Sequence, residues 1–245
     1  MRWRGGVGLV GSLVGVLVGV LLAGGLGGCS LDDLDAVRSA ADQATAIPGA
    51  ASTGLAADAA DQLAGLALAS RRTPSSAGYR RAEFGSAWSD VDHNGCNQRD
   101  DVLLRDAVPG STTVAVQGRC DHDVLAGTWV DPYTERRVVL SDLKDPRQAQ
   151  AVQIDHIVPL AEAWVSGADT WDAERRRAYA NDLAVLLAVD GPTNASKGSG
   201  DPAAWRPRKA YQCVYAERWI TIKATWSLSV DASERRALEE MLGYC

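Results

Sequence analysis

The fold is decided by the stretch IDHIVPL, residues 154–160, an apolar run that carries an acid–histidine pair and closes on a proline. Adjacent side chains on a strand point to opposite faces, so Asp155 and His156 cannot both face one site on a regular strand. Pro159, shortly after His156, disfavours continuation of the strand. The sequence therefore predicts that a strand ends in a loop at Asp155 and His156.

Five further short segments that contain Asp, Asn, Lys or Trp lie before and after this stretch. They read DVDHNGC (90–96), ANDL (180–183), NASKG (194–198), DPAAW (201–205) and YAERWI (215–220). Together with DHIVPLAEAW (155–164), they resemble the HNH nuclease family. More specifically, they are similar to an exported branch related to the C-terminal part of modification-dependent restriction enzymes. The resemblance covers residues 79–245.

This resemblance implies an α+β fold with a ββα-metal core, to which helices and a small β-rich N-terminal part are added. It makes Asp155 a metal ligand and His156 the general base. It makes Asn194, at the start of the following helix, the second protein ligand, while Asn181 holds the loop that aims His156. The third motif position is Asn in place of His, an H-N-N variant. Cleavage in this family leaves 5′-phosphate and 3′-hydroxyl ends, and the kinship favours DNA over RNA.

The residue types suit phosphodiester hydrolysis independently of the resemblance. An imidazole with an ordinary pKa of about 6.5 can take a proton from water at neutral pH. The oxygens of Asp155 and Asn194 suit a hard divalent cation, so Mg²⁺ is expected and Mn²⁺ is the alternative. Such an ion acts as a Lewis acid on the phosphate. Lys197, about one turn beyond Asn194, is expected either to face a non-scissile phosphate or to be solvated.

Residues 1–29 are predicted to be a bacterial export signal. Two arginines begin it, an apolar region spans residues 7–22, and LGGC (26–29) ends it with small residues before a cysteine. This ending resembles a lipobox, in which Cys29 becomes the lipidated first residue of the mature protein. An uncleaved transmembrane anchor is the alternative, since about 20 apolar residues span a bilayer. Either way, the body of the protein is expected outside the cytoplasmic membrane, held to its outer face.

The charge of the chain limits the classes of partner. It has 25 basic and 31 acidic side chains and a net charge of −6, which excludes a polybasic nucleic-acid binder. Residues 30–70 are rich in Ala and Asp and are predicted to be a flexible spacer, with a transient helix over residues 55–68. The expected domain, residues 71–245, is nearly neutral. We therefore expect it to bind nucleic acid weakly and without preference for base sequence. Only one apolar stretch approaches spanning length, which excludes a multipass membrane protein.

Four further cysteines lie in the expected domain: Cys96, Cys120, Cys213 and Cys245. An even number in an exported chain favours two disulfides. Three pairings are possible, and we favour Cys96–Cys120 with Cys213–Cys245 because each pair brackets a contiguous segment. A zinc site is disfavoured, since no C-x-x-C pair is present.

Local patterns predict a mixture of strands and helices. Runs of β-forming residues predict the strands, and apolar residues at helical spacing predict the helices. The last helix has the clearest signal, because Asp231 and Glu234 match a capping box. The expected strands are 112–116, 124–130, 137–140 and 183–189, and the expected helices are 161–165, 171–179, 207–226 and the helix after Asp231.

A second pattern lies upstream of the acid–histidine pair. Calcium-loop positions one, three, five, six and twelve are occupied by Asp90, Asp92, Asn94, Gly95 and Asp101. Position twelve is usually Glu, and no flanking pair of helices is expected. An Asx-rich turn pinned by Cys96 is therefore preferred over a Ca²⁺ site.

These observations predict an envelope-anchored HNH-type nuclease that hydrolyses nucleic acid with one divalent metal and no organic cofactor. The competing interpretation is a non-catalytic surface lipoprotein that uses the same scaffold to bind a partner. The combination of Asp155, His156, Asn181 and Asn194 favours the enzyme, because a pure scaffold does not need all four groups.

Overall fold

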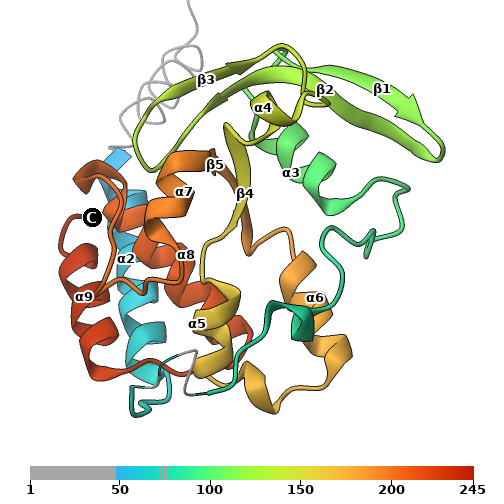
Figure 1. Cartoon of the computed structure of the whole chain (residues 1–245). Coiled ribbons are helices and arrows are strands. Elements are labelled where there is room, and N and C mark those ends of the chain that lie inside the picture. The colour runs from blue at the N-terminus through green and yellow to red at the C-terminus, as the bar shows by residue number, and fades with distance from the viewer. Residues whose placement is uncertain (1–47, 72, 74–76) are drawn as a thin grey trace, which may run out of the picture. The chain divides into compact units, whose positions relative to one another are not determined.

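The computed structural model describes residues 48–71, 73 and 77–245 (Figure 1). The export signal, with Cys29, and the first part of the expected spacer lie outside these residues. The described part combines two antiparallel sheets with helices, which agrees with the predicted α+β class. Within it, no helix has both the length and the apolar character needed to cross a membrane.

The β-rich part is a three-stranded antiparallel sheet in the order β1-β2-β3. Its strands are β1 (Thr113–Gln117), β2 (Cys120–Val130) and β3 (Arg137–Leu140). Helix α3 (Gln98–Asp106) packs against the sheet (Figure 1), and the indole Nε1 of Trp129 donates to the carbonyl oxygen of Leu103 over 2.9 Å. The sequence patterns predicted the strands but not α3.

The strand predicted to end at the acid–histidine pair is β4 (Val152–His156), and it does end at His156. It pairs antiparallel with β5 (Leu186–Asp190), and helix α7 (Gly191–Lys197) follows β5 directly. A Cβ on Gly191 would lie 2.0 Å from the carbonyl oxygen of Gln150. Only glycine therefore lets the β5–α7 junction approach the start of β4 so closely.

Short helices connect these strands and pack around them. Helices α5 (Leu160–Val165) and α6 (Ala173–Asn181) lie between β4 and β5 in the chain, and α4 (Pro146–Ala149) precedes β4. The described 3₁₀ helices are η1 (Arg81–Phe84), η2 (Ala168–Thr170) and η3 (Lys209–Tyr211).

The helical body of the domain corrects one boundary. Helices α8 (Gln212–Thr225) and α9 (Ala232–Leu242) pack with α2 (Pro48–Gly65) (Figure 1). Ala59, Leu63 and the following Leu66 are buried in the same core cluster as α8 and α9. The expectation of a flexible spacer up to residue 70 is wrong for this part, because its apolar residues at helical spacing find a partner. The domain therefore begins before residue 71.

Two disulfides fasten the ends of elements, and both predicted pairings are confirmed. Cys96–Cys120 joins the loop before α3 to the start of β2. Cys213–Cys245 joins the start of α8 to the C-terminal residue. The capping box at α9 is also confirmed, since Asp231 and Glu234 exchange both hydrogen bonds.

Candidate active site

The imidazole of His156 is held in one tautomer. Its Nε2 lies 2.9 Å from the carbonyl oxygen of Ala180 at the C-terminal end of α6. A carbonyl oxygen can only accept, so Nε2 carries the proton and Nδ1 is the basic nitrogen. Burial lowers the pKa of His156 to about 4, and the positive charges of Arg81 and Lys197 act in the same direction. The side chain is therefore neutral at physiological pH, with a lone pair on Nδ1.

An indole ring lies beside this imidazole. The ring of Trp88 is nearly parallel to that of His156, with centroids 6.2 Å apart and an angle of 15° between planes. The next residue, Ser89, donates its backbone N–H to Oδ1 of Asn181 over 2.9 Å. Asn181 is buried, and its Nδ2 donates to the carbonyl oxygen of Arg177. Asn181 thus holds the loop of Trp88, while the carbonyl of the preceding residue orients His156.

Asp155 belongs to a buried ion pair. Lys197 Nζ donates to its Oδ1 over 2.8 Å, and Tyr133 Oη donates to its Oδ2 over 2.6 Å. The same ammonium donates to the backbone carbonyl oxygen of His156 over 2.9 Å. Burial raises the pKa of Tyr133, as does the charge of Asp155, so the phenol remains a donor. One lysine therefore ties both residues of the acid–histidine pair in place.

The expectation of a surface role for Lys197 is wrong. The residue is 2% exposed and lies on the buried side of α7, so its ammonium is not solvated. Burial lowers the pKa of Lys197, and the carboxylate of Asp155 opposes that shift. The reason for the difference is the partner. Nζ of Lys197 donates to Asp155 and to the carbonyl oxygen of His156, and these hydrogen bonds offset part of the cost of burying its charge.

A pocket of about 650 Å³ brings three of the predicted residues together. Asp155, His156 and Asn194 all line it. Asn194 lies on α7, where its Nδ2 donates to Oε1 of Gln153 on β4 over 2.9 Å. Sequence reasoning missed other residues of the lining, where Tyr79, Arg81, Trp88 and Arg99 contribute aromatic and basic side chains. Aromatic residues next to arginines were visible in RRAEFGSAW (80–88), but nothing local ties that segment to His156.

The donor set at this pocket fits a hard divalent cation. Asp155 offers carboxylate oxygens, and Asn194 and Gln153 offer amide oxygens, which are ligands that Mg²⁺ accepts together with water. The groups of Cys with His or Glu among the described residues are Cys96, Cys120 and His122, and Cys213, Glu217 and Cys245. All four cysteines are in disulfides and offer no thiolate ligands.

Comparison with known proteins gives the family. The family model that describes the C-terminal domain of GmrSD restriction endonucleases matches residues 98–241 of this chain. The chain belongs to this HNH-type family. It is also 38% identical over 171 residues to an "Uncharacterized secreted protein" of Arthroderma benhamiae (strain ATCC MYA-4681 / CBS 112371), covering 69% of this chain and 76% of the relative. No solved structure matches.

Membership of the GmrSD C-terminal domain family confirms the resemblance stated from the sequence. The matched residues include Asp155, His156, Asn181 and Asn194. They do not include Trp88 and Arg81, which lie before residue 98. Most of the lining of the pocket therefore comes from the family domain, and part of it comes from the segment that precedes it.

Proposed function

We propose that this GmrSD-type domain is a metal-dependent nuclease that hydrolyses phosphodiester bonds, with His156 as the general base. The observation that carries the proposal is the locked tautomer of His156. Its Nε2–H is held by Ala180, which leaves Nδ1 as a neutral base at the wall of a pocket that also contains Asp155 and Asn194. On this proposal, β4, β5 and α7 are the ββα core of the family.

The chain's own residues would share the work. Nδ1 of His156 takes a proton from water, and the carbonyl of Ala180 stabilises the imidazolium that forms, because it accepts from Nε2–H. Arg81 and Arg99, which line the same pocket, attract the phosphates of the substrate. Lys197 and Tyr133 hold the carboxylate of Asp155 in one orientation. Asp155 and Asn194 would bind the cation, Mg²⁺ or Mn²⁺, which supplies charge neutralisation at the phosphate and the leaving oxygen when bound.

The substrate in this proposal is DNA in preference to RNA, and the products carry 5′-phosphate and 3′-hydroxyl ends. The name of the family supports this substrate class, since its members are described as restriction endonucleases. The nearly neutral domain supports binding without sequence preference.

The proposed location is outside the cell membrane, with a lipid on Cys29. The export signal and the relative described as secreted support it. Mass spectrometry of the membrane fraction tests the anchor. A diacylglyceryl group on an N-terminal Cys29 is expected, and an unmodified Cys29 within an intact N-terminus would refute it.

A cleavage assay tests the catalytic proposal. The full chain, with its disulfides intact, would be incubated with plasmid DNA, single-stranded DNA and RNA in Mg²⁺, Mn²⁺ or EDTA. We expect metal-dependent cleavage that His156→Asn reduces by at least about 100-fold, the usual contribution of a general base. His93→Asn is the matched control, because His93 is exposed and does not line the pocket. A folded protein without cleavage would favour the non-catalytic binding scaffold.

A further inference from the structure

A second hollow adjoins the pocket of His156, and the nuclease proposal does not use it. It has a volume of about 590 Å³, and its lining comes from β3, α4, the start of β4 and the junction of β5 with α7 (Figure 1). Gln150, Gln153 and Ala195 line both hollows. The two hollows are therefore neighbours on one surface, with shared residues at their boundary.

Arginines dominate the charge of both linings. Two of them line the pocket of His156 and three line the second hollow: Arg81 and Arg99, and Arg136, Arg137 and Arg147. The carboxylates of these linings are those of Asp155 and Asp190, and both residues are at most 5% exposed. The whole chain has a net charge of −6, so the positive charge is a local feature of this surface.

The arginines of the second hollow differ in how far they are already paired. Arg137 is exposed, and its guanidinium has no carboxylate partner within the described part of the chain. Nη1 of Arg136 lies 3.4 Å from Oδ1 of Asp190, but the side chain of Arg136 is 64% exposed. Arg147 donates to Asp145 over 2.9 Å. Because an exposed ion pair contributes little, Arg136 and Arg137 are the arginines most available to an anionic ligand.

The turn between β2 and β3 connects these two arginines to the candidate active site. Tyr133 in this turn is buried, and its hydroxyl donates to Oδ2 of Asp155 over 2.6 Å. Arg136 and Arg137 follow three and four residues later, so their Cα atoms lie at most about 15 Å from that of Tyr133. Each strand of duplex DNA rises about 3.4 Å per nucleotide. The arginines are therefore placed to contact phosphates a few nucleotides away from one held at Asp155.

Neutral amides lie at the boundary between the two hollows. Nε2 of Gln153 donates to Oε1 of Gln150 over 3.3 Å, and Oε1 of Gln153 accepts from Nδ2 of Asn194 over 2.9 Å. Amide groups can donate to phosphate oxygens and add no negative charge. A polyanion that extends from one hollow to the other would thus meet amides and arginines along its path.

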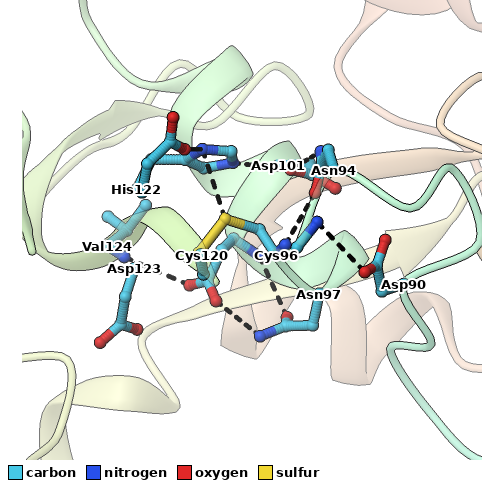
Figure 2. The surroundings of a disulfide bond; sticks show 12 residues. Asp90, Asn94, Cys96, Asn97, Asp101, Cys120, His122, Asp123 and Val124 are labelled. Carbon is cyan, nitrogen blue, oxygen red and sulfur yellow. Dashed lines mark hydrogen bonds and ion pairs between the residues drawn. A yellow bond between two sulfur atoms is a disulfide. The ribbon is translucent and has the colours of Figure 1, made fainter. Parts of the chain in front are cut away.

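The loop before α3 fixes the position of Arg99 in the pocket of His156. Asn97 follows the disulfide-bonded Cys96, and its side chain caps α3 by accepting from the backbone N–H of Arg99 over 3.0 Å (Figure 2). Nη2 of Arg99 donates to carbonyl oxygens at the end of α4 and the start of β4, over 3.4 and 3.3 Å. Burial lowers the pKa of Arg99, but a guanidinium stays charged. Arg99 therefore braces the segment that carries Gln150 and Gln153.

We propose that the two hollows form one groove for the backbone of DNA, in which Arg136 and Arg137 bind phosphates outside the catalytic pocket. This assignment rests on the nuclease function proposed above and gives it a polymeric substrate. Guanidinium groups bind phosphate oxygens with two parallel hydrogen bonds. Contacts to phosphates carry no information about the bases, so this groove adds affinity without preference for base sequence.

DNA binding in EDTA tests the groove without catalysis. Fluorescence anisotropy of the full chain, with disulfides intact, would be measured with a labelled duplex of about 20 base pairs, roughly 70 Å long, over a series of salt concentrations. Each phosphate contact contributes about 0.9 to the slope of log K against log salt. We expect the double variant Arg136→Gln/Arg137→Gln to bind at least about tenfold more weakly at about 50 mM salt, and its slope to fall by about 2.

Two further variants serve as controls. Arg137→Lys should keep most of the affinity, because it retains the charge that faces the phosphate. Arg236→Gln removes the same charge from an exposed position on α9 that lines neither hollow, and its binding should match that of the wild type. The melting temperature of each variant shows that it folds.

Three results would overturn the groove. They are wild-type affinity in the double variant, an equal loss in Arg236→Gln, and no binding of DNA by the wild type at low salt. The cleavage assay keeps this failure separate from that of the nuclease. Cleavage by a chain whose binding does not depend on Arg136 and Arg137 would retain the nuclease and remove the groove. Binding that depends on these arginines, without cleavage in metal, would retain the groove and remove the nuclease.

Discussion

Two lysines are buried in the described part of the domain, in two regions with different tasks. Lys197 lies beneath the candidate active site, and Lys223 lies between α5, α8 and α9. Lys197 pairs with one carboxylate, that of Asp155, whereas Lys223 contacts two, those of Glu162 and Glu234. Each also donates to a backbone carbonyl oxygen.

The different number of carboxylates has opposite electrostatic effects. Burial lowers the pKa of Lys197, and its single carboxylate opposes the shift. The two carboxylates around Lys223 outweigh its burial and raise its pKa. Two carboxylates, on α5 and α9, face the one ammonium of Lys223 on α8, so Lys223 holds these helices together. Lys197 instead balances the single charge of Asp155 and positions that carboxylate. The same residue type is a structural cation in one region and a positioning residue in the other.

Removing Lys223 should have the largest effect on stability. In Lys223→Met, Glu162 and Glu234 stay buried without their cation, and we expect unfolding to become easier by about 4–5 kcal/mol at pH 8. Urea denaturation followed by tryptophan fluorescence measures this. Nuclease activity per folded molecule should be retained at low temperature, since Lys223 does not line the pocket of His156. A loss of activity in the folded variant would contradict the purely structural role.

Removing Lys197 should cost less stability but more activity. In Lys197→Met, only Tyr133 still donates to Asp155, so we expect a loss of about 3 kcal/mol at pH 8. Asp155 and the backbone of His156 also lose a shared partner. With Asp155 as the proposed metal ligand, we expect activity to fall about 10–100-fold, the usual cost of removing a partner of such a ligand. Unfolding and cleavage are measured on the same preparations as for Lys223→Met. Equal activity in the two variants would remove the distinction between the regions.

Sequence reasoning was strongest where a signal is local. The end of β4 at His156 follows from the alternation of side chains and from Pro159, and the start of α9 follows from Asp231 and Glu234. The bracketing of contiguous segments also predicted the right disulfides. These features depend on residues close together in the chain, so no tertiary partner has to be known.

The failures concern contacts between distant segments. Lys197 stands in a polar, Gly-flanked segment and looks solvated, but its partner Asp155 lies 42 residues earlier. Leu63 of α2 sits in an Ala-rich segment that has too little apolar surface to form a core by itself, and α8 and α9 supply the rest. Trp88 reaches His156 because the next residue, Ser89, is held by a hydrogen bond to Asn181, which lies 92 residues later in the chain. No periodicity in the sequence reports such pairings.

The excess of negative charge around Lys223 should make stability depend on pH. Burial raises the pKa of Glu234 from 4.5 to about 7, with a further contribution from Glu162, although Lys223 opposes the shift. The folded state thus keeps a proton that the unfolded chain releases above about pH 4.5. The free energy of unfolding should fall as pH rises between these two values, by about 1–3 kcal/mol.

The substitution Glu234→Gln isolates this effect. It keeps a polar group at the capping box of α9 but cannot titrate. Urea denaturation at several pH values between 4.5 and 8 would be compared with the wild type. We expect the difference in stability between the two proteins to shift in favour of the variant as pH rises. Parallel curves over this range would show that Glu234 does not titrate differently in the folded state.

Tyr133→Phe is the mildest way to disturb the first region. It removes one donor to Oδ2 of Asp155 and leaves Lys197 on Oδ1, so the buried charge stays paired. We expect a stability loss of about 1.5–3 kcal/mol, the usual value for a hydrogen bond to a charged group. Because the ring keeps its contacts with Trp205 and Tyr215, packing should change little. We expect cleavage by Tyr133→Phe to fall, but by less than in Lys197→Met, because one of the two donors that orient Asp155 remains. Unchanged cleavage at saturating metal would show that Lys197 alone positions the carboxylate.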